Sequence, residues 1–212
     1  MDPRTGEALR LLDRYLVEIV ETYELCPWAK TSRTGGELAV EVLWGTPTLD
    51  AWIDAANRAF TDPNIRVAML VAPELAITRR ALHGVRDEVA KRAATLGVAE
   101  FHPDAAYDGT TPARLVPFLR RSPYPMLQCV PLALLDQLRG PPMNVERSEQ
   151  IAMLVKAGGV EAVKPPLVDR IALQNHARVA IEHGAEVEAK LAAIATDRAQ
   201  SYARVGIRLP AI

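Results

Sequence analysis

Three short segments of the 212-residue chain carry side chains whose chemistry goes beyond packing. Cys26 lies in Cys-Pro-Trp-Ala, His102 in Phe-His-Pro, and Arg121, Ser122 and Tyr124 in Arg-Ser-Pro-Tyr-Pro. A thiolate is a nucleophile, an imidazole exchanges protons near neutral pH, and a guanidinium binds carboxylate or phosphate groups. The sequence therefore predicts a pocket in which Arg121 and Ser122 hold a small anion. His102 would move protons there, assisted by Cys26 or Tyr124.

Each of these residues also has a structural interpretation. Cys26 is expected at the end of a helix, where the partial negative charge disfavours a thiolate, and a free cysteine is often a small core residue. His102 is equally explained by hydrogen bonds to loop backbone. Arg121 would then organise the loop, Ser122 would form a turn, and the Tyr124 hydroxyl would cap the loop. The sequence leaves both interpretations open.

The elements that must position these residues alternate along the chain. Apolar residues at helical spacing alternate with short apolar runs, which favours an α/β fold with about four strands in a mixed sheet covered by helices, with α+β as the alternative. Thr46 and Pro47 look like the N-cap and first residue of the second helix. The expected helices are residues 5–25, 47–61, 76–95, 132–139 and 145–157. The expected strands are residues 38–44, 67–71, 98–102 and 126–130.

A long loop is expected between His102 and Tyr124, over residues 103–124. Loops of this length are uncommon inside a domain and are often functional. Two of the three segments border this loop, which places the predicted pocket at the ends of strands, where α/β sheets usually carry their sites.

A change of composition after Gly158-Gly159 divides the chain into an α/β domain, residues 1–158, and a helical extension, residues 159–212. Residues 167–205 contain no proline and are rich in helix-forming residues, which predicts one long helix, kinked at Gly184. Such a helix would wrap the domain or pair with a second copy, so a homodimer through it is one expectation.

Composition narrows the class of protein. The formal net charge of −1 argues against a nucleic-acid-binding protein. No stretch approaches the length of apolar residues that a membrane span needs, and the charged N-terminus does not resemble a secretory signal. With two cysteines, Cys26 and Cys129, we expect free thiols and a cytoplasmic protein without membrane or nucleic-acid partners.

The three segments, in this order, resemble a bacterial family known as domain of unknown function 1415. Members carry Cys-Pro-Phe-Ala, then Phe-His-Pro, then Arg-Ser-Pro-Tyr-Pro followed by a strand, and the resemblance covers roughly residues 8–158. It implies a site at Cys26, His102, Arg121, Ser122 and Tyr124, and no particular activity. Relatives usually carry a histidine where this chain has Gln128, which implies a lost or altered activity if that histidine is functional.

Three classes of function remain open. The favoured one is an enzyme that acts on a small anionic metabolite through a Cys/His/Arg/Tyr pocket. The second is a haem or metal protein with Cys26 or His102 as ligand, although no metal-binding motif is present and the sequence leaves the cofactor unknown. The third is a non-catalytic module that dimerises or binds a partner through the C-terminal helix.

Overall fold

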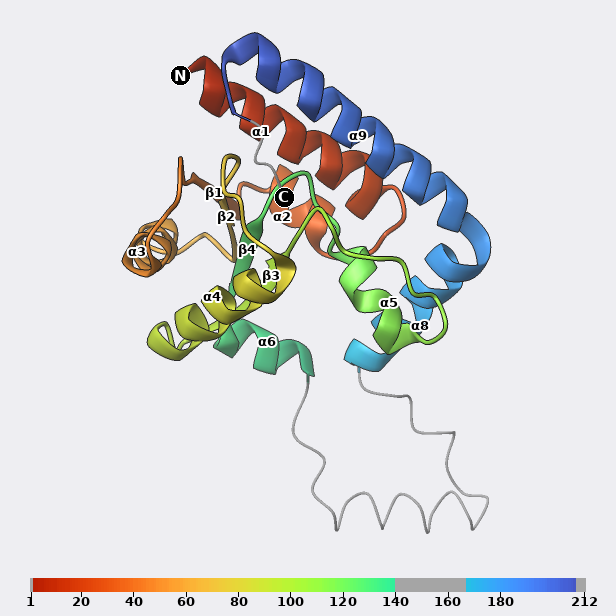
Figure 1. Cartoon of the computed structure of the whole chain (residues 1–212). Coiled ribbons are helices and arrows are strands. Elements are labelled where there is room, and N and C mark those ends of the chain that lie inside the picture. Colours follow the sequence, from red (N-terminus) through yellow and green to blue (C-terminus); the bar gives the residue numbers. More distant parts are fainter. Residues whose placement is uncertain (1, 140–166, 209–212) are drawn as a thin grey trace.

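A four-stranded sheet forms the centre of the computed structural model, which describes residues 2–139 and 167–208 (Figure 1). All four expected strands are present within one to two residues of their expected bounds, in the order β1-β2-β4-β3. Helices cover the sheet, so the predicted α/β fold with a mixed sheet is confirmed. The strands are β1 (Leu38–Val42), β2 (Val67–Val71), β3 (Leu96–Phe101) and β4 (Met126–Pro131).

The last strand of the chain lies between two earlier ones. β1 and β2 are parallel and are joined through helix α3 (Leu49–Ala59), whereas β4 runs antiparallel to both β2 and β3. Because side chains alternate along a strand, Leu127 and Cys129 face one side of the sheet and Met126 and Gln128 face the other. In the sheet, Gln128 is paired with Met69 of β2.

Threonine side chains cap the first turns of α3, α4 (Arg79–Arg92) and a third helix described below. The hydroxyls of Thr48 and Thr78 each accept a hydrogen bond from the amide three residues on, at 3.2 Å, and start α3 and α4. The expected N-cap at Thr46 is therefore wrong. The chain turns at Thr46-Pro47, and α3 begins after Thr48, whose hydroxyl accepts the Ala51 amide.

Residues 103–124 are not one long loop. Thr111 caps a further helix, α5 (Pro112–Leu119), with proline at its first position. Pro117 lies inside this helix, so the expected loop over residues 103–124 is interrupted by a regular element. α5 buries Leu115 and Phe118 and lies beside α8 (Figure 1).

The first helix is shorter than expected. α1 (Pro3–Tyr15) continues into a π-helical segment, η1 (Leu16–Glu21), and the chain then turns at Glu24, which has a positive φ of 48°. Cys26 therefore lies in a separate turn before the short helix α2 (Ala29–Thr34), and the expectation of a single helix over residues 5–25 is wrong.

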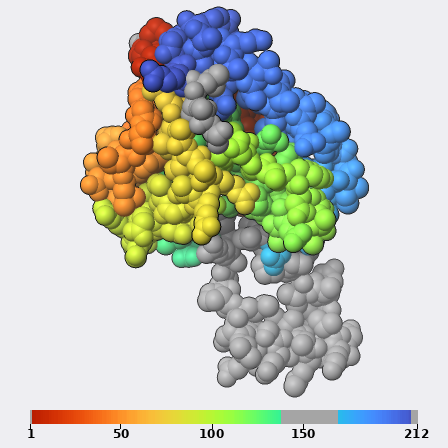
Figure 2. All heavy atoms as spheres, in the orientation of Figure 1, coloured from red at the N-terminus to blue at the C-terminus, as the bar shows by residue number. Residues whose placement is uncertain are grey.

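The long C-terminal helix is present as α8 (Leu167–His176), a π-helical segment η2 (Ala177–His183) and α9 (Gly184–Val205). Gly184 marks the end of the π-helical segment, near the expected kink. α9 lies along α1, and Asp197 binds Arg10 and Arg14 across this contact at 2.8 and 2.7 Å (Figure 1). Figure 2 shows the C-terminal helices along one border of the molecule, beside α5.

Two hydrophobic cores flank the sheet. One is formed with α3 and α4 around Trp52, Leu70 and Leu127, and the other with α1, η1, α5 and α9. The second core includes Val187 and Ile194 of α9, so the C-terminal helices and the sheet share it. Helix α6 (Leu132–Arg139) follows β4 as predicted, whereas the expected helix 145–157 and the domain boundary at residues 158–159 lie outside the described residues.

The packing of α9 predicts a contrast between two isoleucines of the C-terminal helices. Ile194 is 1 % exposed, so Ile194→Ala should lower the free energy of unfolding by about 2–5 kcal/mol. Ile181 is 74 % exposed, and Ile181→Ala should change it by less than about 0.5 kcal/mol. Chemical denaturation of both variants measures the difference, and equal losses would contradict the packing described here.

Candidate functional site

Tyr124 joins the sheet to the first helix. Its side chain is fully buried, and its hydroxyl donates a hydrogen bond of 2.5 Å to the carbonyl oxygen of Ala8. Burial raises the pKa of Tyr124 well above its ordinary value, so the phenol stays protonated. Ser122 is also buried, and its hydroxyl donates to the carbonyl of Tyr124 at 2.7 Å. Both hydroxyls are therefore used in holding the segment that leads into β4.

Arg121 binds backbone. Its Nε–H group donates to the carbonyl of Pro103 at 3.0 Å, which ties the two ends of the segment between β3 and β4 together. The guanidinium of Arg198 on α9 donates to the carbonyl of Pro123. Arg121 and Ser122 line a small cavity of about 60 Å³ next to α9.

His102 is 1 % exposed and is held through both ring nitrogens. Its Nε2 lies 2.8 Å from the carbonyl oxygen of Ile77, and its Nδ1 accepts a hydrogen bond from the backbone N–H of Asp104 at 3.1 Å. These partners fit a neutral ring with its proton on Nε2. The ring forms part of the wall of a second cavity, beside α4 and α5.

The expected convergence of the five predicted residues is not what the structure shows. Cys26 lines one cavity, His102 a second, and Arg121 and Ser122 a third, whereas Tyr124 is enclosed in the core. The roles assigned to these residues remain predictions. Cys26 is the predicted residue that lines the most apolar of these cavities.

The cavity beside Cys26, called the thiol cavity below, has a volume of about 280 Å³. Its floor is the sheet face that carries Met69 and Gln128, and its other walls come from η1, α2, α5 and α8. Trp28, 37 % exposed, stands in its wall. The lining is mainly apolar, with polar groups from Tyr15, Cys26, Ser32, Arg120, Gln128 and Asn175.

The turn around Cys26 changes the electrostatics expected at the thiol. Burial raises the pKa of Cys26, while hydrogen bonds from the backbone amides of Trp28 and Ala29 act in the opposite direction. The sulfur therefore faces amide donors and not the carbonyl end of a helix, which corrects the placement expected from the sequence. Burial has the larger effect, so Cys26 is a neutral thiol at neutral pH.

Arg120 and Gln128 are two polar residues of the thiol cavity whose side chains make no hydrogen bond to a described residue. Asn175 donates to the carbonyl of Leu25 at 2.9 Å, but neither Arg120 nor Gln128 makes a side-chain hydrogen bond to any described residue. The nearest carboxylate to Arg120 is Glu100, at 4.0 Å, the limit for an ion pair. Burial lowers the pKa of Arg120, but a guanidinium remains charged in a protein.

The hydroxyl of Tyr15 is a third donor without a partner in the wall of the thiol cavity. Tyr15 is fully buried, and its oxygen has no hydrogen-bond partner among the described residues. Burial raises the pKa of Tyr15, and the nearby charge of Arg120 acts against that rise. The guanidinium and the phenol therefore lie close enough to interact electrostatically.

The sequence singled out Arg121 and not its neighbour Arg120, and the structure gives the two side chains different surroundings. Arg121 turns toward the backbone of Pro103, whereas its neighbour Arg120, at the end of α5, reaches the thiol cavity. Nothing in the sequence singled out Tyr15. Gln128 was singled out by the departure from the family pattern, and that signal proves informative because this position faces the cavity that Cys26 lines.

Within the described ranges, no group of three or more His, Cys, Asp or Glu side chains is placed to hold a metal ion. Over the same ranges, no helix is long and apolar enough to cross a membrane.

The fold and the thiol cavity define an α/β domain with a mainly apolar cavity of ligand size between its sheet and its helices. The family model described as protein of unknown function, DUF1415, matches residues 7–137, and the chain belongs to this family. The match spans α1 to α6, which includes most walls of the thiol cavity. Neither the curated proteins nor the solved structures gave a match.

The buried Tyr124 hydroxyl makes stability sensitive to alkaline pH. Tyr124→Phe should lower the free energy of unfolding by about 1–3 kcal/mol at pH 7, because the hydrogen bond to Ala8 is lost. Because burial raises the pKa of Tyr124 in the folded protein, above about pH 10 the tyrosine ionises in the unfolded chain and stays protonated in the folded one, which stabilises the unfolded state. This favours unfolding as pH rises, and the gap between wild type and variant should shrink by up to about 1.4 kcal/mol per pH unit.

Urea denaturation at several pH values between 7 and 11 measures this gap. Tyr107→Phe is the matched control, because Tyr107 is 42 % exposed and its ring rests on Phe118 with or without the hydroxyl. A Tyr124→Phe variant as stable as wild type at neutral pH would show that the hydroxyl does not hold the segment.

Proposed function

We propose that the protein binds a small, mainly apolar carboxylic acid in the thiol cavity. The observation that carries this proposal is the pair of Arg120 and Gln128, two hydrogen-bond donors without partners in an otherwise apolar cavity. Both side chains face the cavity without a hydrogen bond to a described residue, so their N–H groups are open to a ligand that brings acceptors.

A carboxylate suits these donors better than a neutral group does. A guanidinium binds a carboxylate through two parallel N–H donors, and the amide of Gln128 supplies a further N–H. Glu100 lies too far from Arg120 for a hydrogen bond and leaves the donors of its guanidinium free. The apolar walls would contribute the rest of the affinity, at about 25 cal/mol for each Å² of apolar ligand surface that they bury.

Catalysis by Cys26 is a second candidate, favoured by one observation. Cys26 and Gln128 line the same cavity. The resemblance to the family implies a histidine in relatives at the position of Gln128. A histidine there would supply the base that a neutral thiol needs to become a nucleophile. In this chain the amide of Gln128 cannot take a proton, which supports binding without thiol chemistry as its present role.

A homodimer through the C-terminal helices remains a proposal. Fewer apolar residues of these helices are exposed for such a contact than the sequence led us to expect. The apolar residues of α9, such as Val187 and Ile194, are buried against the protein's own core. A second copy would therefore have to contact Leu173 and Ile181, which are 54 % and 74 % exposed.

Isothermal titration with hexanoate and phenylacetate tests the proposed ligand class. We expect both acids to bind, with hexanol binding more weakly because it brings no charge to Arg120. Arg120→Gln should weaken hexanoate binding by about tenfold to a hundredfold, the usual effect of losing a charge-assisted hydrogen bond. Binding of hexanol should hardly change.

Arg114→Gln is the matched control, because Arg114 lies on the same helix, is exposed and pairs with Asp108. Hexanoate should also slow alkylation of Cys26 by iodoacetamide, which reports occupancy of the thiol cavity itself. The proposal is overturned if no acid binds, or if hexanoate and hexanol bind equally to wild type and Arg120→Gln.

The second candidate predicts a gain of reactivity. Cys26 should react slowly with iodoacetamide at pH 7, because burial keeps its pKa high. Gln128→His should raise the rate by about tenfold if the imidazole can take the thiol proton. Mass spectrometry of the labelled peptide measures the rate, with Cys26→Ser as the unlabelled reference and the exposed Gln137→His as control. Equal rates in wild type and Gln128→His would remove the catalytic candidate.

A further inference from the structure

A second cavity, called the basic cleft below, lies on the other side of Arg120. It has a volume of about 430 Å³ and is lined by Arg79, Arg80 and His83 of α4, Glu100 and His102 at the end of β3, and Arg120 after α5. Three guanidinium groups and one carboxylate therefore border the same space.

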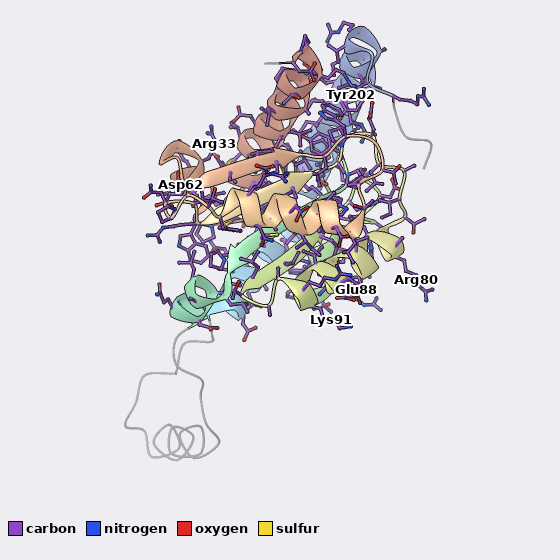
Figure 3. The ribbon with its side chains drawn as sticks, turned by 90° about the vertical axis from the view of Figure 1, so that its left-hand side faces the viewer. Arg33, Asp62, Arg80, Glu88, Lys91 and Tyr202 are labelled. Atoms are coloured by element: carbon purple, nitrogen blue, oxygen red, sulfur yellow. The ribbon has the colours of Figure 1, made fainter. Side chains whose placement is uncertain are left out.

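Arg79 and Arg80, the first two residues of α4, differ from most other arginines of the described residues. Most described arginines form an ion pair with a carboxylate, as Arg58 does with Glu41 and Arg92 with Asp50. Arg79 and Arg80 have no hydrogen-bond or ion-pair partner among the described residues, and both border the basic cleft. Figure 3 shows Arg80 at the start of α4, at the opposite end of the helix from Lys91.

Glu100 is already neutralised by its neighbours. Its carboxylate lies 3.0 Å from the His83 ring and 3.2 Å from the Arg86 guanidinium. Burial tends to raise the pKa of Glu100, but the hydrogen bond with His83 and the charges of Arg120 and Arg86 bring it below its ordinary value. The Glu100 carboxylate is therefore paired with His83 and Arg86 and does not compensate the charges of Arg79 and Arg80.

The start of α4 adds donors of the same polarity. Thr78 accepts the Ala81 amide with its hydroxyl and the Leu82 amide with its carbonyl, at 3.2 and 2.9 Å. The amides of Arg79 and Arg80, at the positive end of the helix dipole, have no backbone partner in the described part of the chain.

We propose that the basic cleft binds the phosphate group of a small molecule. A phosphate has the charge and enough oxygen acceptors to pair with several guanidinium groups around one cavity. A single carboxylate would leave some of the guanidinium donors without an acceptor. A long polyanion fits less well, because the protein as a whole carries a net charge of −1.

Arg120 and Val116 line both the thiol cavity and the basic cleft. A phosphate in the basic cleft would therefore attract the same guanidinium that we assign to the carboxylate. Phosphate should weaken the binding of hexanoate, and by reciprocity hexanoate should weaken the binding of phosphate.

Isothermal titration with inorganic phosphate and with pyrophosphate, at low ionic strength and pH 7, tests the basic cleft independently of the thiol cavity. We expect both to bind, and the double variant Arg79→Gln/Arg80→Gln to lose about tenfold or more in affinity. The control is Arg58→Gln/Arg92→Gln, which removes the same charge from exposed arginines that have carboxylate partners. Thermal melts should show all these variants folded, because all four arginines lie at the surface.

The outcomes distinguish binding of the anion in the basic cleft from a general attraction of anions to positive charge on the protein. Loss of binding in the Arg79/Arg80 variant alone supports the site, whereas equal losses in both variants would show attraction to net charge and overturn it. Failure of wild type to bind either anion also overturns it. Hexanoate binding by the Arg79/Arg80 variant then separates the two proposals, since the thiol cavity should be unaffected.

Discussion

The burial of β4 on both faces is the constraint on which the rest of the structure depends. β4 lies between β2 and β3, so each of its faces needs a cover of helices. Leu127 and Cys129 face the core built with α3 and α4, while Met126 faces the core built with α1 and α9. The second cover comes from both ends of the chain, because α9 lies along α1. The C-terminal helices thus complete a core that the N-terminal helices only partly cover.

The segment before β4 explains why polar residues are buried there. This segment must pass from the end of α5 into the central strand, through the interior, where unpaired polar groups are costly. Tyr124 binds α1, Arg121 binds the segment after β3, and Arg198 of α9 binds the Pro123 carbonyl. A motif that looks catalytic by its residue types therefore serves, in this geometry, to join three elements. His102 is also bound in this way, because both of its ring nitrogens hydrogen-bond to backbone groups.

The groups without partners gather instead around Arg120. Its guanidinium lies between an apolar cavity and a basic one, with Glu100 at the limit of an ion pair. No described side chain hydrogen-bonds this guanidinium, and the Arg120 side chain is 38 % exposed, so its donors are open to a ligand. Each cavity also contains other groups without a described partner. These are the Gln128 amide in the thiol cavity and the guanidinium groups of Arg79 and Arg80 in the basic cleft. The two proposed ligand groups therefore share one residue, which couples the two cavities physically.

The sequence by itself determined the strands and the fold class, because short apolar runs alternate with apolar residues at helical spacing. Its three short motifs pointed to the family. The sequence also drew attention to Cys26 and to position 128. Tertiary structure alone decided which polar residues are free. Arg120 and Arg121 are identical in type and adjacent, and only the direction of the chain leaving α5 assigns one to backbone and the other to a cavity. Hydrogen-bond satisfaction depends on partners distant in the sequence, such as Ala8 for Tyr124, so no local pattern can reveal it.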